Sequence, residues 1–203
     1  MIINRKSMKI NKKILEDLVK KIRFDKNCIE ATFQFRLLME IAATIDKNKI
    51  FPESNIKNHG LEKRDFIKKE IDIVVEEGGE KCERVAIELK MPMKGQVPEQ
   101  MYKFVKDIRF LEQLKSGGDF TLCFLIVVTN DDSFWEGGRE GIYHYFRDES
   151  KVLSGEIFKP TGKGKNEESY TLSGEYRIEW KEAGETATGF KYFIVEVNPI
   201  ARS

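Results

Sequence analysis

Two carboxylates and one lysine stand at positions that could support phosphoryl chemistry. Asp72 lies in an apolar stretch, and Glu88-Leu89-Lys90 follows after fifteen intervening residues. Carboxylates bind hard divalent cations such as Mg²⁺, which retain several of their water ligands. A lysine beside such a cation can orient a metal-bound water or offset negative charge that develops on a phosphate. Asp72, Glu88 and Lys90 are therefore our candidate catalytic residues, with the two carboxylates as candidate metal ligands.

A predicted β-hairpin would bring these three residues together. Apolar and polar residues alternate in 71–76 and again in 85–90, and a glycine-containing turn separates the two arms. If the odd-numbered residues of the second arm face the core, Glu88 and Lys90 share the opposite face. Residues two apart on a strand lie about 6.6 Å apart along that face, so the Lys90 ammonium can reach a site at Glu88. Two carboxylates held this close repel each other unless a cation lies between them.

The Glu-x-Lys spacing has no value by itself. Chance alone predicts about three such triplets in this composition, and the chain contains three, at 88–90, 149–151 and 179–181. Only the first lies on an alternating strand, beside an acidic strand and before a predicted helix. The alternative interpretation is an exposed charge cluster on a half-solvated sheet. The catalytic hypothesis therefore depends on the hairpin register, which a shift of one residue would destroy.

The other elements predict an α/β fold with a mixed sheet and helices on its faces. Apolar periodicity predicts helices over 10–24, 28–46, 98–115 and 134–148, the last weakened by three glycines, and strands over 50–56, 120–128, 156–159, 175–180 and 190–197. Pro52 should place the first of these strands at a sheet edge or make it irregular. The continuous apolar run of 120–128 indicates a strand buried on both faces. A polar loop is expected over 161–169.

Length and composition predict one domain over residues 1–203. Apolar residues make up 40% of the chain and charged residues 34%, which suits a soluble fold with a real core. We expect a core over about 28–130, a basic N-terminal helix at 10–24 and a C-terminal strand extension over about 151–200. Those last strands could extend the sheet, form a dimer surface or clamp a substrate.

The formal net charge of +1 neither favours nor excludes nucleic acid as a partner. The distribution is more informative, because residues 1–26 carry a net +6 and residues 47–70 a net +3. The N-terminal third is therefore the expected phosphate-facing surface. A solubilising helix face is the alternative interpretation.

The sparse cysteines and histidines exclude several other classes of site. Cys28, Cys82 and Cys123 are scattered and form no Cys-x-x-Cys pair, which argues against a disulfide framework or a structural zinc site. A reducing cytoplasm is the expected location. The longest apolar run is far too short to span a bilayer, so no membrane association is expected. His59 and His144 are the only histidines and lack metal-ligand spacing.

Asp72, the fifteen-residue spacing, Glu88-Leu89-Lys90 and the two flanking helices resemble the PD-(D/E)XK nuclease superfamily. The resemblance covers roughly residues 28–129 and implies a restriction-endonuclease-like αβββαβ core. It implies metal-dependent hydrolysis of phosphodiester bonds in nucleic acid, with DNA as the expected substrate and Mg²⁺ or Mn²⁺ as the cofactor. Asp72, Glu88 and the Leu89 carbonyl would bind the metal, and Lys90 would position or activate the water. Ile71 stands where the eponymous proline would be.

The resemblance adds two further site residues. Many members carry a glutamate on the helix before the hairpin that contacts the metal, often through water. Glu30 is the best candidate for this further metal ligand, with Glu40 as its competitor and a solvated helix glutamate as the alternative interpretation. Some members carry Gln-x-x-x-Tyr on the helix after the lysine strand. Gln100 matches the glutamine, which would bind near the metal or phosphate; an ordinary first-turn helix residue is the alternative interpretation. Phe104 replaces the tyrosine, which puts membership of that branch in doubt.

A different class of function is also compatible with the sequence. The same fold could be a non-catalytic module that binds nucleic acid or protein, with the charge cluster serving solubility. A homodimer is compatible with the nuclease hypothesis, because chains with one active site often cut double strands as pairs. The sequence identifies no interface.

Overall fold

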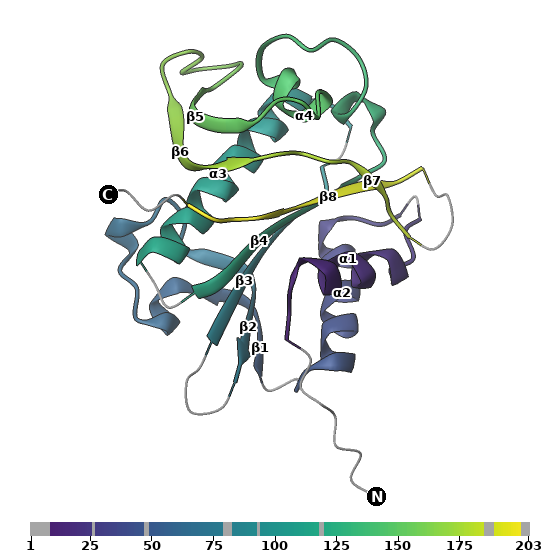
Figure 1. The fold of residues 1–203 in the computed structure, drawn as a ribbon, viewed down its shortest axis with the longest axis vertical. Helices are drawn as coiled ribbons and strands as arrows, with labels where there is room; N and C mark the ends of the chain where they lie inside the picture. The colour runs from purple at the N-terminus through teal and green to yellow at the C-terminus, as the bar shows by residue number, and fades with distance from the viewer. Residues whose placement is uncertain are drawn as a thin grey trace, which may run out of the picture.

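The computed structural model describes residues 9–25, 27–46, 49–78, 83–92, 94–117, 120–184 and 189–199. A mixed sheet of six strands in the order β1-β2-β3-β4-β8-β7 forms the centre, and β5 and β6 form a separate two-stranded sheet (Figure 1). The α/β class and the mixed sheet are thus confirmed. The helices are α1 (Lys12–Lys21), α2 (Glu30–Thr44), α3 (Val97–Gly117) and α4 (His144–Arg147). The strands are β1 (Ile50–Asn55), β2 (Glu70–Glu77), β3 (Glu83–Lys90), β4 (Phe120–Thr129), β5 (Leu153–Phe158), β6 (Ser169–Tyr176), β7 (Lys181–Glu182) and β8 (Lys191–Glu196).

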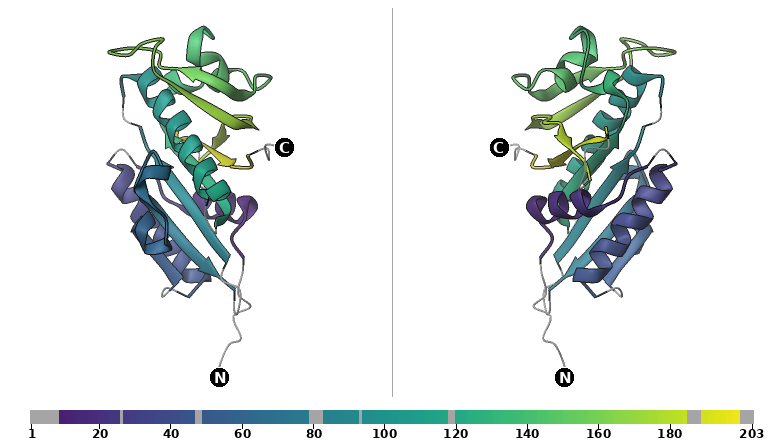
Figure 2. Two further views of the ribbon diagram at one scale, coloured as in Figure 1. Left: turned by 90° about the vertical axis from the view of Figure 1, so that its left-hand side faces the viewer. Right: turned by 90° about the vertical axis from the view of Figure 1, so that its right-hand side faces the viewer.

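Helices cover both faces of the central sheet. Figure 2 shows α3 on one face and α1 and α2 on the other. Ile73, Val85 and Ile87 belong to the core under α1 and α2, whereas Val74 and Ala86 belong to the core under α3. Because each face is covered, apolar residues are required on both sides of β4, and this explains its unbroken apolar sequence.

The predicted hairpin forms with the expected register. Ile73 pairs with Ile87 and Val75 with Val85 in the antiparallel β2–β3 ladder. The recorded ladder begins at the Ile73–Ile87 pair, directly beside Asp72 and Glu88. Ile71 belongs to the core under α3 and not to the core that contains Ile73 and Val75, so the predicted alternation breaks around Asp72. β1 pairs only with β2 and lies at the sheet edge, as Pro52 predicts.

The long helix α3 connects two parallel strands. β3 and β4 pair in parallel, which requires a crossover connection, and α3 supplies it. The element order from α2 to β4 is therefore helix, three strands, helix, strand, as the sequence predicted.

The helix predicted over 134–148 is wrong. Only His144–Arg147 is α-helical, preceded by two short 3₁₀ turns. Gly137 and Gly141 adopt positive φ angles of 102° and 58°, which a right-handed helix cannot contain. The Arg147 guanidinium donates hydrogen bonds to the carbonyls of Ser133 and Gly138 and so stabilises the irregular path.

The predicted C-terminal strands are divided between the central sheet and the separate β5–β6 sheet. The strand predicted over 190–197 is β8, which extends the central sheet beside β4. Those predicted over 156–159 and 175–180 are shifted to 153–158 and 169–176, and they form a hairpin that packs against α3. The connection between β5 and β6 occupies most of the predicted polar loop.

No helix in the described ranges is long and apolar enough to cross a membrane. Cys28 and Cys123 are free thiols, both buried. Cys82 lies outside the described residues, as do residues 1–8 and 26 of the basic N-terminal segment.

Candidate active site

Asp72 is anchored to the neighbouring strand through its side chain. Its Oδ2 accepts a hydrogen bond of 2.7 Å from the backbone N–H of Leu89. Gln34 of α2 donates a hydrogen bond of 3.1 Å to the Asp72 carbonyl, so the helix also fixes the backbone at this point. The Asp72 carboxylate is therefore held beside β3, next to Glu88 and Lys90.

Glu88 lies under α3, fully buried. Lys68 donates a hydrogen bond to its Oε2, whereas Oε1 has no hydrogen-bond partner. Burial and the nearby carboxylates of Asp72 and Asp107 raise the pKa of Glu88 well above its ordinary value. The interpretation of an exposed charge cluster on a half-solvated sheet is therefore wrong for this residue.

The Lys90 ammonium lies among carboxylates from three elements. Its Nζ is 3.6 Å from Asp107 Oδ2, 3.8 Å from Asp72 Oδ2 and 4.0 Å from Glu30 Oε1. It also donates a hydrogen bond of 2.7 Å to the Leu89 carbonyl. Burial alone would lower the pKa of Lys90, but the surrounding carboxylates outweigh burial and raise it. Lys90 is therefore held as a cation.

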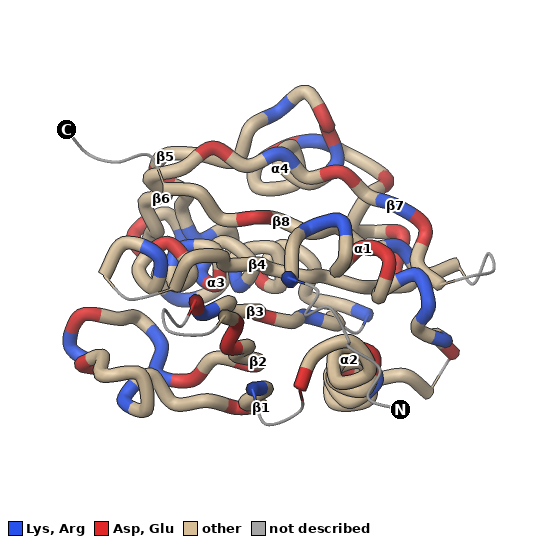
Figure 3. The backbone as a smooth tube through the Cα atoms, turned by 60° about the horizontal axis from the view of Figure 1, so that its bottom comes forward, with Lys and Arg blue, Asp and Glu red and all other residues tan. Residues whose placement is uncertain are grey.

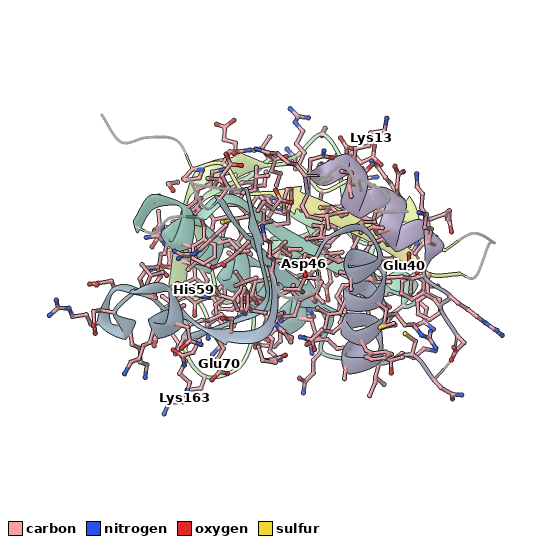
Figure 4. The ribbon with its side chains drawn as sticks, turned by 90° about the horizontal axis from the view of Figure 1, so that it is seen from below. Lys13, Glu40, Asp46, His59, Glu70 and Lys163 are labelled. Carbon is pink, nitrogen blue, oxygen red and sulfur yellow. The ribbon has the colours of Figure 1, made fainter. Side chains whose placement is uncertain are left out.

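Glu30 joins the cluster from the first turn of α2. Its Oε2 accepts a hydrogen bond of 2.9 Å from the backbone N–H of Met91, directly after Lys90. The side chain is 49% exposed, so it can exchange this partner for water or substrate. Glu40 lies ten residues further along the same helix, about 15 Å along its axis, and its position in Figure 4 is well away from the start of β2 at Glu70. Of the two competing glutamates, the structure brings Glu30 to the site.

Gln100 lies farther from the carboxylate cluster than the resemblance implies. It lies in the first turn of α3, and its backbone N–H donates to the Gln96 carbonyl. Among the described residues, no hydrogen bond or ion pair joins its side chain to the carboxylate cluster. It is on the same helix face as Asp107 but two turns away, about 10 Å along the axis.

Two members of the cluster were missed from the sequence. Asp107 of α3 is 3% exposed and accepts a hydrogen bond of 2.8 Å from Lys68. The sequence did contain a signal for Asp107. This residue lies between Phe104 and Ile108 on a buried helical stripe, where an aspartate requires a polar partner or a ligand. Lys68 precedes β2 in an irregular segment, and no local pattern distinguishes it from other lysines.

The charge of the cluster does not balance. The carboxylates of Glu30, Asp72, Glu88 and Asp107 outnumber the ammonium groups of Lys68 and Lys90, leaving two negative charges when all are ionised. Glu88 Oε1 and Asp107 Oδ2 are buried without hydrogen-bond partners. Such uncompensated buried charge is costly unless a cation joins it.

A hard divalent cation fits this donor set. Carboxylate and carbonyl oxygens are the ligands that Mg²⁺ and Mn²⁺ prefer, and one such ion would neutralise the excess charge. Within the described ranges, no three carboxylate, imidazole or thiol groups are already arranged to enclose a metal. Lysine ammonium groups lie between the carboxylates instead.

The basic N-terminal helix is not part of this site. α1 packs with α2 and β8, on the sheet face opposite α3. Lys13 on α1 and Glu70, two residues before Asp72, lie on opposite sides of the view in Figure 4. Basic and acidic positions are interspersed along the described chain in Figure 3. The segment 63–69 is the part of the predicted basic surface that reaches the site, through Lys68.

With this geometry described, the chain was compared with known proteins. No protein-family model, curated protein or solved structure matches it. The functional assignment therefore depends on the site itself.

Proposed function

We propose that this protein is a restriction-endonuclease-like nuclease of the PD-(D/E)XK type, which hydrolyses phosphodiester bonds in DNA with Mg²⁺ or Mn²⁺. One observation carries the proposal. Asp72, Glu88 and Lys90 converge at the ends of paired strands, in a partly buried cluster that has more carboxylates than ammonium groups and two buried carboxylate oxygens without hydrogen bonds. Perturbed ionisable groups that converge in this way are typical of catalytic sites.

The residues divide into metal ligands and water-positioning groups. Asp72, Glu88 and the Leu89 carbonyl would hold the metal, which when bound activates water and offsets charge on the phosphate. Lys90 now donates to the Leu89 carbonyl, so metal binding there would free its ammonium to face water or a phosphate oxygen. The Asp72 and Asp107 carboxylates keep that ammonium at the site and charged.

The burial of the cluster disfavours a role in solubility alone. A solubilising cluster gains nothing from placing Glu88 beneath a helix, because removing a carboxylate from water costs several kcal/mol. The element order from α2 to β4 and the parallel β3–β4 pair also support the proposed fold family. DNA as the nucleic acid, the cytoplasmic location and a homodimer stay predictions.

Metal-dependent thermal stability tests the metal centre. Mn²⁺ at about 100 times its Kd should stabilise the wild-type protein by about 2.7 kcal/mol, which raises Tm by about 5 to 10 °C. Asp72→Asn should lose this shift. Asp65→Asn, at an exposed carboxylate in the short 3₁₀ helix that precedes Lys68, is the matched control and should retain the shift. No shift in the wild type, or an equal shift in Asp72→Asn, would discard the proposal.

A further inference from the structure

Asp107 is the buried acid for which the proposed nuclease motif has no role. It lies on α3, beneath which Glu88 is buried, and it comes from a part of the chain remote from the hairpin. Lys68 donates to its Oδ1 at 2.8 Å, whereas Oδ2 has no hydrogen-bond donor and lies 3.6 Å from Lys90 Nζ. This oxygen, which is ion-paired with Lys90 but accepts no hydrogen bond, thus points into the cluster.

A second buried carboxylate on the same helix, Glu112, differs from Asp107 because both of its oxygens accept hydrogen bonds. Glu112 is also fully buried, but it accepts hydrogen bonds from the backbone of Ser173 and Gly174, from the Tyr176 hydroxyl and from Arg109. The fold therefore satisfies a buried carboxylate on α3 where its role is structural. Asp107 and Glu88 instead each retain one oxygen that accepts no hydrogen bond, which is the condition expected of ligands prepared for a cation.

Lys68 already occupies the position of a cation between these two residues. Its ammonium donates to both Glu88 Oε2 and Asp107 Oδ1 and lies 5.3 Å from the centre of the Phe110 ring. An ammonium shared by two carboxylates offsets their repulsion, as a metal would. The side chain is 21% exposed and comes from an irregular segment, so it has a path to solvent.

We propose that Asp107 is a metal ligand that binds a divalent cation jointly with Glu88, and that Lys68 bridges these two carboxylates when no metal is bound. The inference rests on the proposed nuclease function and adds a ligand from α3 to its metal centre. It implies direct competition between the Lys68 ammonium and the metal.

Cysteine substitution with Cd²⁺ tests ligation directly, because thiolates bind this soft ion and give an ultraviolet charge-transfer band. Asp107→Cys and Asp72→Cys should each give a saturable band above that of the wild type, whose own cysteines set the background. Lys103→Cys, at an exposed position one turn earlier on α3, should give none. Circular dichroism establishes that each variant is folded.

The outcomes separate this inference from the proposed function. A band in Asp72→Cys without one in Asp107→Cys would overturn the role of Asp107 and leave the metal centre intact. No band in either variant would overturn both.

Competition by Lys68 gives a second measurement that does not alter Asp107. Lys68→Gln should bind Mn²⁺ about tenfold more tightly in calorimetry, equivalent to about 1.4 kcal/mol, because it removes the competing ammonium. Lys69→Gln, at the adjacent exposed lysine, should leave the Kd unchanged. Equal or weaker binding by Lys68→Gln would contradict the competition.

Discussion

Glu88 is held where its negative charge is unfavourable, and we expect this charge to lower the stability of the folded protein. Its carboxylate is fully buried, faces Asp72 and Asp107, and leaves Oε1 without a donor. A glutamine has nearly the same shape without the charge, so it removes the repulsion from the Asp72 and Asp107 carboxylates. A residue retained at the expense of stability is expected at functional sites rather than in structural networks.

Glu88→Gln should therefore stabilise the metal-free protein. Because the pKa of Glu88 in the folded state lies above its ordinary value of 4.5, the folded protein binds the extra proton. The free energy of unfolding thus falls as pH rises from 4.5 through the folded pKa. In urea titrations with EDTA, we expect the variant to be more stable by about 1–2 kcal/mol at pH 8 and equal to wild type at pH 4. Greater stability of the wild type at pH 8 would contradict this account.

Glu30 and Glu40 offer a matched comparison on one helix. Glu30 contacts Met91 N–H and approaches Lys90, whereas Glu40 lies about 15 Å further along the helix axis. Residues that orient a metal site without being its main ligands typically change metal affinity by about 10- to 100-fold. Glu30→Gln should weaken Mn²⁺ binding in calorimetry within that range, and Glu40→Gln should not. The reverse ranking would reassign the helical acid.

At the scale of elements, Glu112 joins the β5–β6 hairpin to α3. Its carboxylate accepts hydrogen bonds from two backbone N–H groups of β6 and from the Tyr176 hydroxyl. Gly174 is required there, because a Cβ would lie 2.8 Å from the Asn198 carbonyl and would clash with the Tyr176 ring. This network fixes the hairpin against the helix that carries Asp107.

Glu112→Gln should be strongly destabilising, in contrast to Glu88→Gln. The amide nitrogen cannot accept the hydrogen bonds that the lost oxygen accepted, so buried donors are left unpaired. We expect the free energy of unfolding in urea to fall by about 3 kcal/mol. Glu175→Gln, at an exposed position of β6, should change it by less than about 0.5 kcal/mol. A small effect of Glu112→Gln would show that the network is not structural.

Elements were predictable where the determining pattern is local. Alternation and a glycine turn were enough to predict the β2–β3 hairpin, which brings the Asp72 side chain beside β3. The apolar stripe of α3 predicted the burial of one helix face, but apolar periodicity does not mark Asp107, a polar residue on that buried face. The segment 134–148 was wrongly predicted because its path depends on Arg147 contacts and positive φ angles at glycines. Lys68 could not be found, because its partners come from β3 and α3 and leave no local signal.

The whole chain has a net charge of only +1, yet four of its carboxylates are concentrated at one site. The predicted basic helix α1 lies on the opposite face of the sheet from α3, so its lysines are not beside the cluster. The described chain instead concentrates four carboxylates and two lysines between β2, β3, α2 and α3. Nuclease activity would thus depend on this cluster rather than on a general attraction for nucleic acid.

DNA cleavage with Mn²⁺ by wild type and Lys90→Ala is the most direct test of this account. Lys151→Ala is the matched control, because Lys151 ends another Glu-x-Lys triplet at an exposed position. Plasmid, linear and single-stranded DNA, with RNA for comparison, cover the substrate classes. We expect cleavage of DNA by wild type and Lys151→Ala, and a rate lower by about 10²- to 10⁴-fold in Lys90→Ala with its Mn²⁺-dependent Tm shift retained. Equal cleavage by wild type and Lys90→Ala would contradict the catalytic assignment.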